Sequence, residues 1–200
     1  MKKMKTLIAA LLAAGPASAQ NVSDVDAMRE LMHGFNPRGQ AELNRLVQDD
    51  VQRFCSQKNW SKNKAAMQKL EKQQLSMVKY PADGKLVGNW RNGERIAQTG
   101  VGKQYSDNPK TPSGGNCYAC HQLAPQEVSY GTIGPSLRNF GKTRGNTEAI
   151  QRYAYGKIYN SQAYSMCSNM PRFGHAGILT EEQIKDLVAL LLDPESPVNK

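Results

Sequence analysis

The sequence predicts an all-α protein, and three observations support this fold class. Apolar residues recur at spacings of three and four in several segments, as they do on one face of a helix. No segment shows the alternation of apolar and polar residues that a half-buried strand requires. The clearest helix has its own start signal, the capping box Thr180-Glu181-Glu182-Gln183. With 39% hydrophobic and 22% charged residues, the composition is that of an ordinary globular protein.

Residues 1–19 have the pattern of a cleavable signal peptide. Lys2, Lys3 and Lys5 precede a short apolar stretch, which ends in the Ala-x-Ala exit Ala17-Ser18-Ala19. This stretch is too short to remain as a membrane span, and no other apolar run reaches the roughly 20 residues of a transmembrane helix. We therefore expect cleavage after Ala19 and a soluble protein in a bacterial periplasm.

Residues 20–85 predict an N-terminal extension of three helices. The first is capped by Ser23 and ends at Gly34, and the third is capped by Ser61 and runs to Tyr80, before Pro81. The second carries an apolar face at helical spacing, with Cys55 near its end: Leu43, Leu46, Val47, Val51 and Phe54. These helices are too weakly apolar to form a large core, so we expect them to pack on the domain that follows, residues 86–200.

Three helices are expected in that domain. The first lies around Trp90 to Ala97, and the second runs from Thr147 through Tyr159. The last follows the capping box, with one apolar stripe before Asp193-Pro194: Ile184, Leu187, Val188, Leu191 and Leu192. We expect the last helix to cross the first, where the small side chains of Gly93 and Ala97 permit close approach.

The motif Cys117-Tyr118-Ala119-Cys120-His121 predicts one covalently bound haem c. Two thiols at this spacing can each add to a vinyl group of one haem, and the adjacent imidazole is then its proximal iron ligand. A structural zinc site would need a second close pair of ligands, and Cys55 and Cys167 stand alone. A thioredoxin-type dithiol would follow a strand in a βαβ pattern, which the sequence lacks.

Two further segments predict the surroundings of the iron. In class I c-type cytochromes a Gly-Pro-x-Leu stretch after the haem motif brings a proline carbonyl to the proximal imidazole, a role for Pro135 here, although the stretch could be a simple turn. Met170, in an irregular loop before the last helix, is the expected second axial ligand, and its thioether would favour ferrous iron. Met166 and His175 are alternatives. We therefore expect a class I cytochrome c fold with an N-terminal helical extension.

Cys55 and Cys167 remain as an even pair. An oxidising compartment favours a disulfide between them, and the alternative is two buried free thiols. The loop that the bridge would close is long, and chain entropy assigns it a stabilisation of roughly 4 to 5 kcal/mol.

The net charge of +9 would fall to +6 when the three leader lysines are removed. A basic protein can bind nucleic acid, but no arginine-rich or aromatic-interleaved stripe appears, so we expect no nucleic-acid partner. An acidic protein partner and a merely solvated basic surface remain open as explanations.

Residues 115–200 carry the runs GNCYACHQ, GTIGPSL, CSNMPRFGH and GILTEEQIKDLVALLLDPESPVNK. They resemble the SoxX family, the monohaem cytochrome subunits of the SoxAX complexes of bacterial thiosulfate oxidation. The resemblance implies a heterodimer with a SoxA-type haem protein, which joins thiosulfate oxidatively to a cysteine of a SoxYZ-type carrier. The substrate-activating haem of that reaction lies in SoxA, so the resemblance implies an electron-transferring subunit without catalytic residues.

Joining thiosulfate to a thiol releases two electrons, whereas one c-type haem takes one at a time, so a downstream cytochrome c would have to remove them. Two other functions stay open at this point. One is a free periplasmic cytochrome c that serves another dehydrogenase. The other is a haem enzyme or gas sensor with an open iron position.

Overall fold

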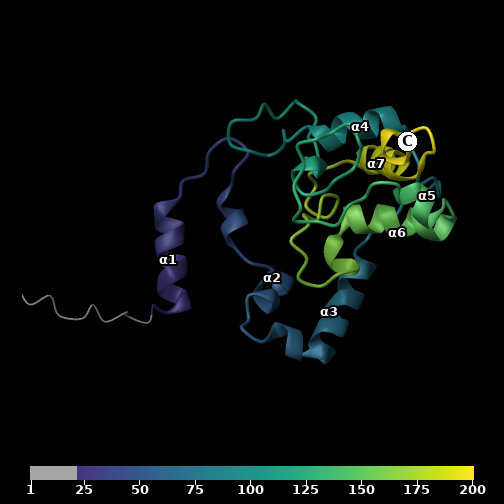
Figure 1. Ribbon diagram of the computed structural model, residues 1–200. Helices are drawn as coiled ribbons and strands as arrows, with labels where there is room; N and C mark the ends of the chain where they lie inside the picture. The colour runs from purple at the N-terminus through teal and green to yellow at the C-terminus, as the bar shows by residue number, and fades with distance from the viewer. Residues whose placement is uncertain (1–21) are drawn as a thin grey trace, which may run out of the picture. The chain divides into compact units, whose positions relative to one another are not determined.

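The computed structural model describes residues 22–200, so the expected signal peptide lies outside the described residues. The chain divides into two compact units between Phe35 and Asn36. In the first unit, helix α1 (Asp24–Gly34) begins where Ser23 accepts a hydrogen bond from the Asp26 N–H, as predicted. None of its residues is buried. The second unit, residues 36–200, contains the other helices (Figure 1).

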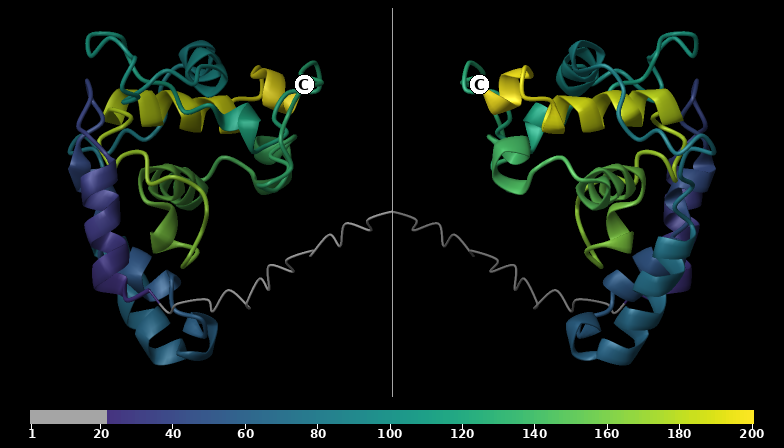
Figure 2. Two further views of the ribbon diagram at one scale, coloured as in Figure 1. Left: turned by 90° about the vertical axis from the view of Figure 1, so that its left-hand side faces the viewer. Right: turned by 90° about the vertical axis from the view of Figure 1, so that its right-hand side faces the viewer.

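The second unit is built on the crossing of α4 (Trp90–Gln98) and α7 (Glu181–Leu192). One view in Figure 2 shows α4 nearly end-on while α7 runs across the picture, so the two axes cross steeply. A methyl group added at Gly93 would lie 2.2 Å from the Asp186 carbonyl oxygen and 3.0 Å from Leu190 Cβ. The Gly88 N–H also donates to the Lys185 carbonyl, at 2.9 Å. The predicted crossing of α4 and α7 therefore exists, and it depends on the absence of a side chain at Gly93.

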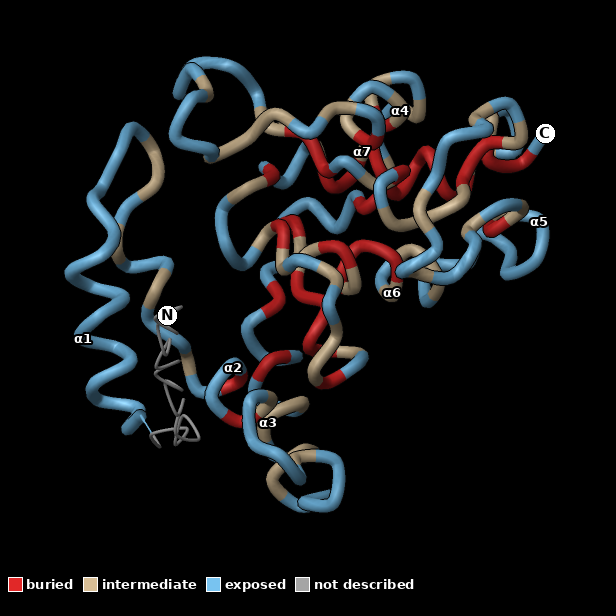
Figure 3. The backbone as a smooth tube through the Cα atoms, turned by 60° about the vertical axis from the view of Figure 1, so that its left-hand side comes forward, coloured by how far each residue is buried: buried red, intermediate tan, exposed pale blue. Residues whose placement is uncertain are grey.

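Helix α7 is the centre of the hydrophobic core. Its capping box is complete, because the Thr180 hydroxyl accepts from the Gln183 N–H at 3.2 Å and the Gln183 amide oxygen accepts from the Thr180 N–H at 3.0 Å. The stripe from Ile184 to Leu192 is buried along the length of the helix (Figure 3). Helix α6 (Glu148–Tyr159) packs against it, and Thr147 precedes α6 without a side-chain capping bond.

The segment after α7 closes the core. The Asn199 amide oxygen accepts from Gly141 and Lys142 N–H groups in α5 (Phe140–Arg144), a short helix that the sequence analysis did not predict. The Asn199 amide nitrogen donates to the carbonyls of Leu191 and Asp193 at the end of α7. One side chain therefore satisfies the ends of two helices.

A smaller core lies between α2 (Asp50–Cys55), α3 (Lys64–Ser76) and the segment around Met166. Val51, Phe54 and Met166 are its buried members. These residues belong to the same compact unit as the main core, so this part of the expected extension, unlike residues 22–35, shares a unit with the following domain.

The extension differs in detail from the prediction. A single second helix over residues 43–55 is wrong: Leu43–Leu46 form a 3-10 turn, and α2 starts anew after Asp49, which makes a capping box with Gln52. The apolar spacing runs on across this break, but it does not decide where a helix starts. Here the capping side chain of Asp49 does so. The third helix begins after Asn63, which accepts from the Ala66 N–H, and it ends at Ser76, before Tyr80.

Between residues 22 and 200 the only extended pairing is an isolated bridge of Arg38 with Ala41. None of the helices in this described part combines the length and the apolar character that crossing a bilayer requires.

Candidate haem site

The cysteine motif forms one tight turn. Cys117–Ala119 is a 3-10 helix preceded by Asn116 in the left-handed conformation, at φ 44°. The N–H groups of Cys120 and His121 both donate to the Cys117 carbonyl, at 3.1 and 2.9 Å. This turn brings the two thiols and the imidazole onto one short stretch of backbone, and neither thiol is in a disulfide.

The segment from Gly131 to Leu137 folds back against this turn. Three of its N–H groups, those of Gly131, Gly134 and Leu137, donate to carbonyls within residues 118–122, each at 2.8 Å. A methyl group added at Gly131 would lie 1.8 Å from the Ala119 carbonyl oxygen. The loop therefore packs closely against the backbone of the motif. Gly131 allows this close contact because it has no side chain.

The same loop fixes the imidazole of His121. The Pro135 carbonyl oxygen lies 2.7 Å from Nδ1, and a carbonyl can only accept, so Nδ1 carries the proton. A methyl group at Gly134 would lie 2.2 Å from Cε1, so the ring occupies the space that a side chain would fill. This hydrogen bond leaves the lone pair of Nε2 available, which is the arrangement that a metal-ligating histidine requires.

The surroundings of the thiols also test the alternatives to haem. Burial raises the pKa of the Cys117 thiol to about 12, whereas a thioredoxin-type dithiol works with a lowered thiol pKa. Among the residues that the structure describes, no three His, Cys, Asp or Glu side chains gather in an arrangement that could hold a metal ion. The two thiols therefore lack the further ligands of a tetrahedral zinc site. The residues present do fit a covalently attached haem.

Met170 lies in the loop between α6 and α7, which is fastened at several points. The Ser161 hydroxyl donates to the Met170 carbonyl at 2.5 Å, and the Met170 N–H donates to the Ser168 hydroxyl at 3.1 Å. Met170 and Cys117 both pack at the edge of the main core. The structure thus gives Met170 a defined backbone position next to the core that also carries the cysteine motif.

The two alternative ligands are placed differently. Met166 is a buried member of the small core with Val51 and Phe54, so its thioether is used in packing. His175 is exposed, and its backbone N–H donates to the Tyr159 carbonyl at 3.0 Å. Desolvation and the nearby Arg172 guanidinium lower the pKa of His175, with Asp49 opposing them.

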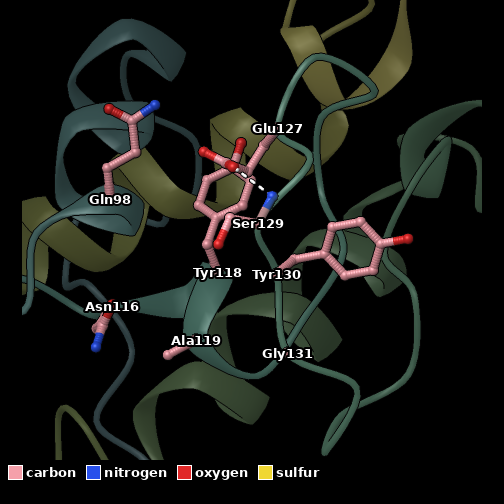
Figure 4. A pocket seen from close by; sticks show the side chains of 8 residues that line it. All are labelled: Gln98, Asn116, Tyr118, Ala119, Glu127, Ser129, Tyr130 and Gly131. Carbon is pink, nitrogen blue, oxygen red and sulfur yellow. Dashed lines mark hydrogen bonds between the residues drawn. The ribbon is translucent and has the colours of Figure 1, made fainter.

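A polar pocket of about 380 Å³ adjoins the motif (Figure 4). Tyr118 and Ala119, which lie between the two cysteines, contribute to its wall, together with Tyr130 and the loop in which the Glu127 carboxylate accepts from the Ser129 N–H at 2.7 Å. Neither thiol nor His121 lines this pocket. It is therefore separate from the predicted haem ligands.

The structure joins Cys55, at the end of α2, to Cys167 in a disulfide, with the two Cα atoms 5.4 Å apart. Close to it, the Arg172 guanidinium donates to the Asp49 carboxylate. Asp49, Ser161 and Arg172 were not among the residues expected from the sequence. Asp49 had a signal, because Asp49 and Gln52 have capping-box spacing, but its pairing with Arg172 spans 123 residues and leaves no local pattern.

Comparison with known proteins identifies the class. The family model "Cytochrome c" matches residues 90–193, just over half of the 200-residue chain. An "Uncharacterized lipoprotein" of Aquifex aeolicus (strain VF5) is 36% identical over 211 residues, which cover 99% of this chain and 100% of that protein. The chain belongs to the cytochrome c family, with its all-α fold. Membership implies covalently bound haem c and a role in electron transfer.

One solved structure is also similar, a chain in the crystal structure of SoxXA from P. pantotrophus. The two sequences are 26% identical, and the match covers 60% of this chain and 95% of that one, with a TM-score of 0.40.

Proposed function

We propose that this chain is the electron-transferring cytochrome c subunit of a thiosulfate-oxidising complex. It would accept electrons from a SoxA-type haem subunit while thiosulfate is coupled oxidatively to a cysteine of a SoxYZ-type carrier protein, and a downstream cytochrome c would remove them. The proposal rests on the cytochrome c family membership and on the SoxX-like runs around Cys117, Met170 and the C-terminal helix.

The roles of the residues follow from the site. Cys117 and Cys120 would attach one haem c through thioether bonds, and the haem supplies reversible one-electron exchange at its iron. His121 would coordinate through Nε2, and the hydrogen bond from Nδ1 to Pro135 would hold the ring and increase its basicity. Met170 would be the second axial ligand. With both axial positions filled, the chain would have no open position for a substrate, so no residue is assigned a catalytic role.

The structural observation that supports haem ligation, on which the proposed role depends, is the orientation of His121. Gly134 and Pro135 together present Nε2 as a free ligand beside two unpaired thiols. A redox dithiol would not require a carbonyl fixed at Nδ1 of a neighbouring histidine.

We further propose that the protein is exported to the periplasm by the leader 1–19. A cytochrome c needs a compartment in which thioethers and disulfides are made, and the relative from Aquifex aeolicus bears the name lipoprotein. Fractionation of cells tests this: recovery in the soluble periplasmic fraction is expected, and tight association with membranes would point to a lipid anchor.

The experiment that tests the function is a pull-down of the tagged, haem-loaded protein from cells grown on thiosulfate. We expect a stoichiometric second haem protein on a haem-stained gel, identifiable by mass spectrometry. A matched pull-down from cells grown without thiosulfate is the control. Recovery of the bare monomer under both conditions would contradict the subunit role and favour a free carrier that serves another dehydrogenase.

A further inference from the structure

The loop that carries Met170 is tied on both sides to the N-terminal extension. Three residues before Met170, Cys167 is joined to Cys55 of α2. Two residues after it, Arg172 is paired with Asp49, the N-cap of α2. Met166, one residue before the disulfide, is buried in the small core that α2 and α3 build. Each end of the six-residue stretch around Met170 is therefore held by the same short segment of distant sequence.

A buried pair of amides strengthens this connection. The Asn160 side chain is 0% exposed and donates to the carbonyl and the side-chain oxygen of Gln74 in α3, at 3.2 and 3.0 Å. The next residue, Ser161, is equally buried and donates to the Met170 carbonyl. Buried hydrogen bonds are costly to break, so α3 is connected to the backbone of Met170 through two neighbouring side chains. The Asn160 amide oxygen has no partner.

Between these links the extension and the loop are not closely packed. A cavity of about 490 Å³ separates them, bordered by Val51 and Gln52 of α2 and by Met170, Pro171 and Ile178. Gln162 also lines it, with its amide nitrogen donating to the Ser168 carbonyl and its amide oxygen without a partner. On this side the loop is therefore held to the extension by the discrete links, together with the packing of Met166 in the small core.

We propose that residues 49–76, which we call the distal clamp, position the thioether of Met170 for axial ligation. Asp49, Cys55 and Gln74 are its positioning residues, and they act through Arg172, Cys167 and Asn160. Loss of a link would let the loop move into the cavity and would weaken Met170 against competing ligands. This inference rests on the proposed ligation by Met170, and it assigns a function to the extension.

Imidazole provides the test, because it competes with a methionine for the iron of the haem-loaded protein. The Asp49→Asn variant keeps the helix cap, since asparagine caps as well as aspartate, but it removes the charge that faces Arg172. We expect imidazole to bind the ferric variant about fivefold more tightly than the wild type, an effect of the size of one partly exposed ion pair. The matched control is Asp50→Asn, on the same helix, where the charge faces Arg53 and not the loop.

The disulfide gives an independent test. In the Cys55→Ser/Cys167→Ser variant we expect a larger gain in imidazole affinity, about tenfold or more, and a lower reduction potential. If this variant does not fold, the wild-type holoprotein can be reduced, alkylated and reoxidised at the iron before the same titration, with circular dichroism to verify its helices. Imidazole affinities of the Asp49→Asn and disulfide-free proteins equal to those of the wild type and Asp50→Asn would overturn the clamp.

The failure of Met170 ligation would look different. A ferric wild type without the far-red absorption band of methionine–iron ligation would refute the ligand itself, and the clamp with it. A wild type that shows the band, with clamp variants that bind imidazole no better, would refute the clamp alone.

Discussion

At the scale of single residues, two neighbours define the position of the His121 ring: the Pro135 carbonyl and Gly134, which has no side chain. Pro135 accepts from Nδ1 at 2.7 Å, and Gly134 leaves the space in which the ring lies. The cysteine motif, His121 and Pro135 were accessible to sequence reasoning because they lie within 20 residues and each has a local pattern. Asp49 was not, because its partner is 123 residues away.

Met170 and Met166 provide a residue-scale prediction. Met170→Leu removes the sulfur at nearly constant volume, so we expect loss of the far-red absorption band and a lower reduction potential, because a thioether favours ferrous iron. Met166→Leu is the control. Its side chain packs in the small core, where such an exchange costs less than about 1.5 kcal/mol, and it should keep the band. The reverse pattern would make Met166 the ligand.

A second prediction concerns the charge of Asp49. Partial burial raises the pKa of its carboxyl group, but the Gln52 N–H and the Arg172 guanidinium outweigh burial and hold that pKa below the usual 3.8. A group whose pKa is lowered by folding stabilises the protein fully above its unfolded pKa, and the stabilisation is lost as the pH falls through its folded pKa.

Urea unfolding of the wild type and the Asp49→Asn variant checks this at two pH values. At pH 6 the variant should have the lower free energy of unfolding, and near pH 3 the difference should shrink. A difference that stays constant or grows towards low pH would show that the carboxylate is not the stabilising species.

At the scale of elements, helix starts were predicted well wherever a capping box preceded a long apolar stripe. In α7 both signals agree, and its start was predicted correctly. In residues 43–55 they conflict: apolar spacing continues through residues 47–49, while the Asp49 capping box starts a new helix. Helix α5 has only five residues, Phe140–Arg144, and a segment that short carries no periodicity to detect.

The element-scale prediction uses two threonines at N-cap positions. Thr180→Ala should lower the free energy of unfolding by about 1 kcal/mol, because the capping bond to the Gln183 N–H is lost. Thr147→Ala, at the start of α6, should cost less, since its side chain makes no capping bond. Thermal unfolding of the two variants compares them, and equal losses would mean that the capping bond of Thr180 does not stabilise α7.

The C-terminal run that contributed to the SoxX resemblance also has a purely structural role. The Ser196 hydroxyl donates to the Leu190 carbonyl at 2.6 Å, Val198 is buried, and Asn199 joins the ends of α5 and α7. These contacts would serve any cytochrome of this fold. Packing and hydrogen bonding therefore account for this run without any partner.

At the scale of the whole molecule, a bond between residues 112 apart in sequence unites the extension with the haem domain. The sequence shows that the two cysteines form an even pair, but it does not show that their Cα atoms come within 5.4 Å of each other. Residues 36–85 of the extension share one compact unit with the main core, whereas residues 22–35 belong to the other unit. The buried apolar residues of the extension are few.

The whole-molecule prediction is that reduction of Cys55–Cys167 lowers the free energy of unfolding by roughly 4 to 5 kcal/mol, the chain-entropy value for a loop of this length. Denaturant unfolding with and without a reductant measures it. Intact mass after alkylation identifies the bond: in the haem-loaded protein no thiol should react before reduction and two should react after it. Labelling of Cys55 and Cys167 without a reductant would contradict the bridge.

The closed loop between Cys55 and Cys167 contains Cys117 and Cys120. A cell that makes this protein therefore has to oxidise one pair of cysteines while it keeps another pair, on the same chain, reduced for its cofactor. A disulfide between Cys117 and Cys120 would compete with both events, because it would close only a short loop. The yield of mature protein thus depends on thiol sorting during biogenesis, and a host that oxidises exported chains faster than it loads them would accumulate a stable, colourless product.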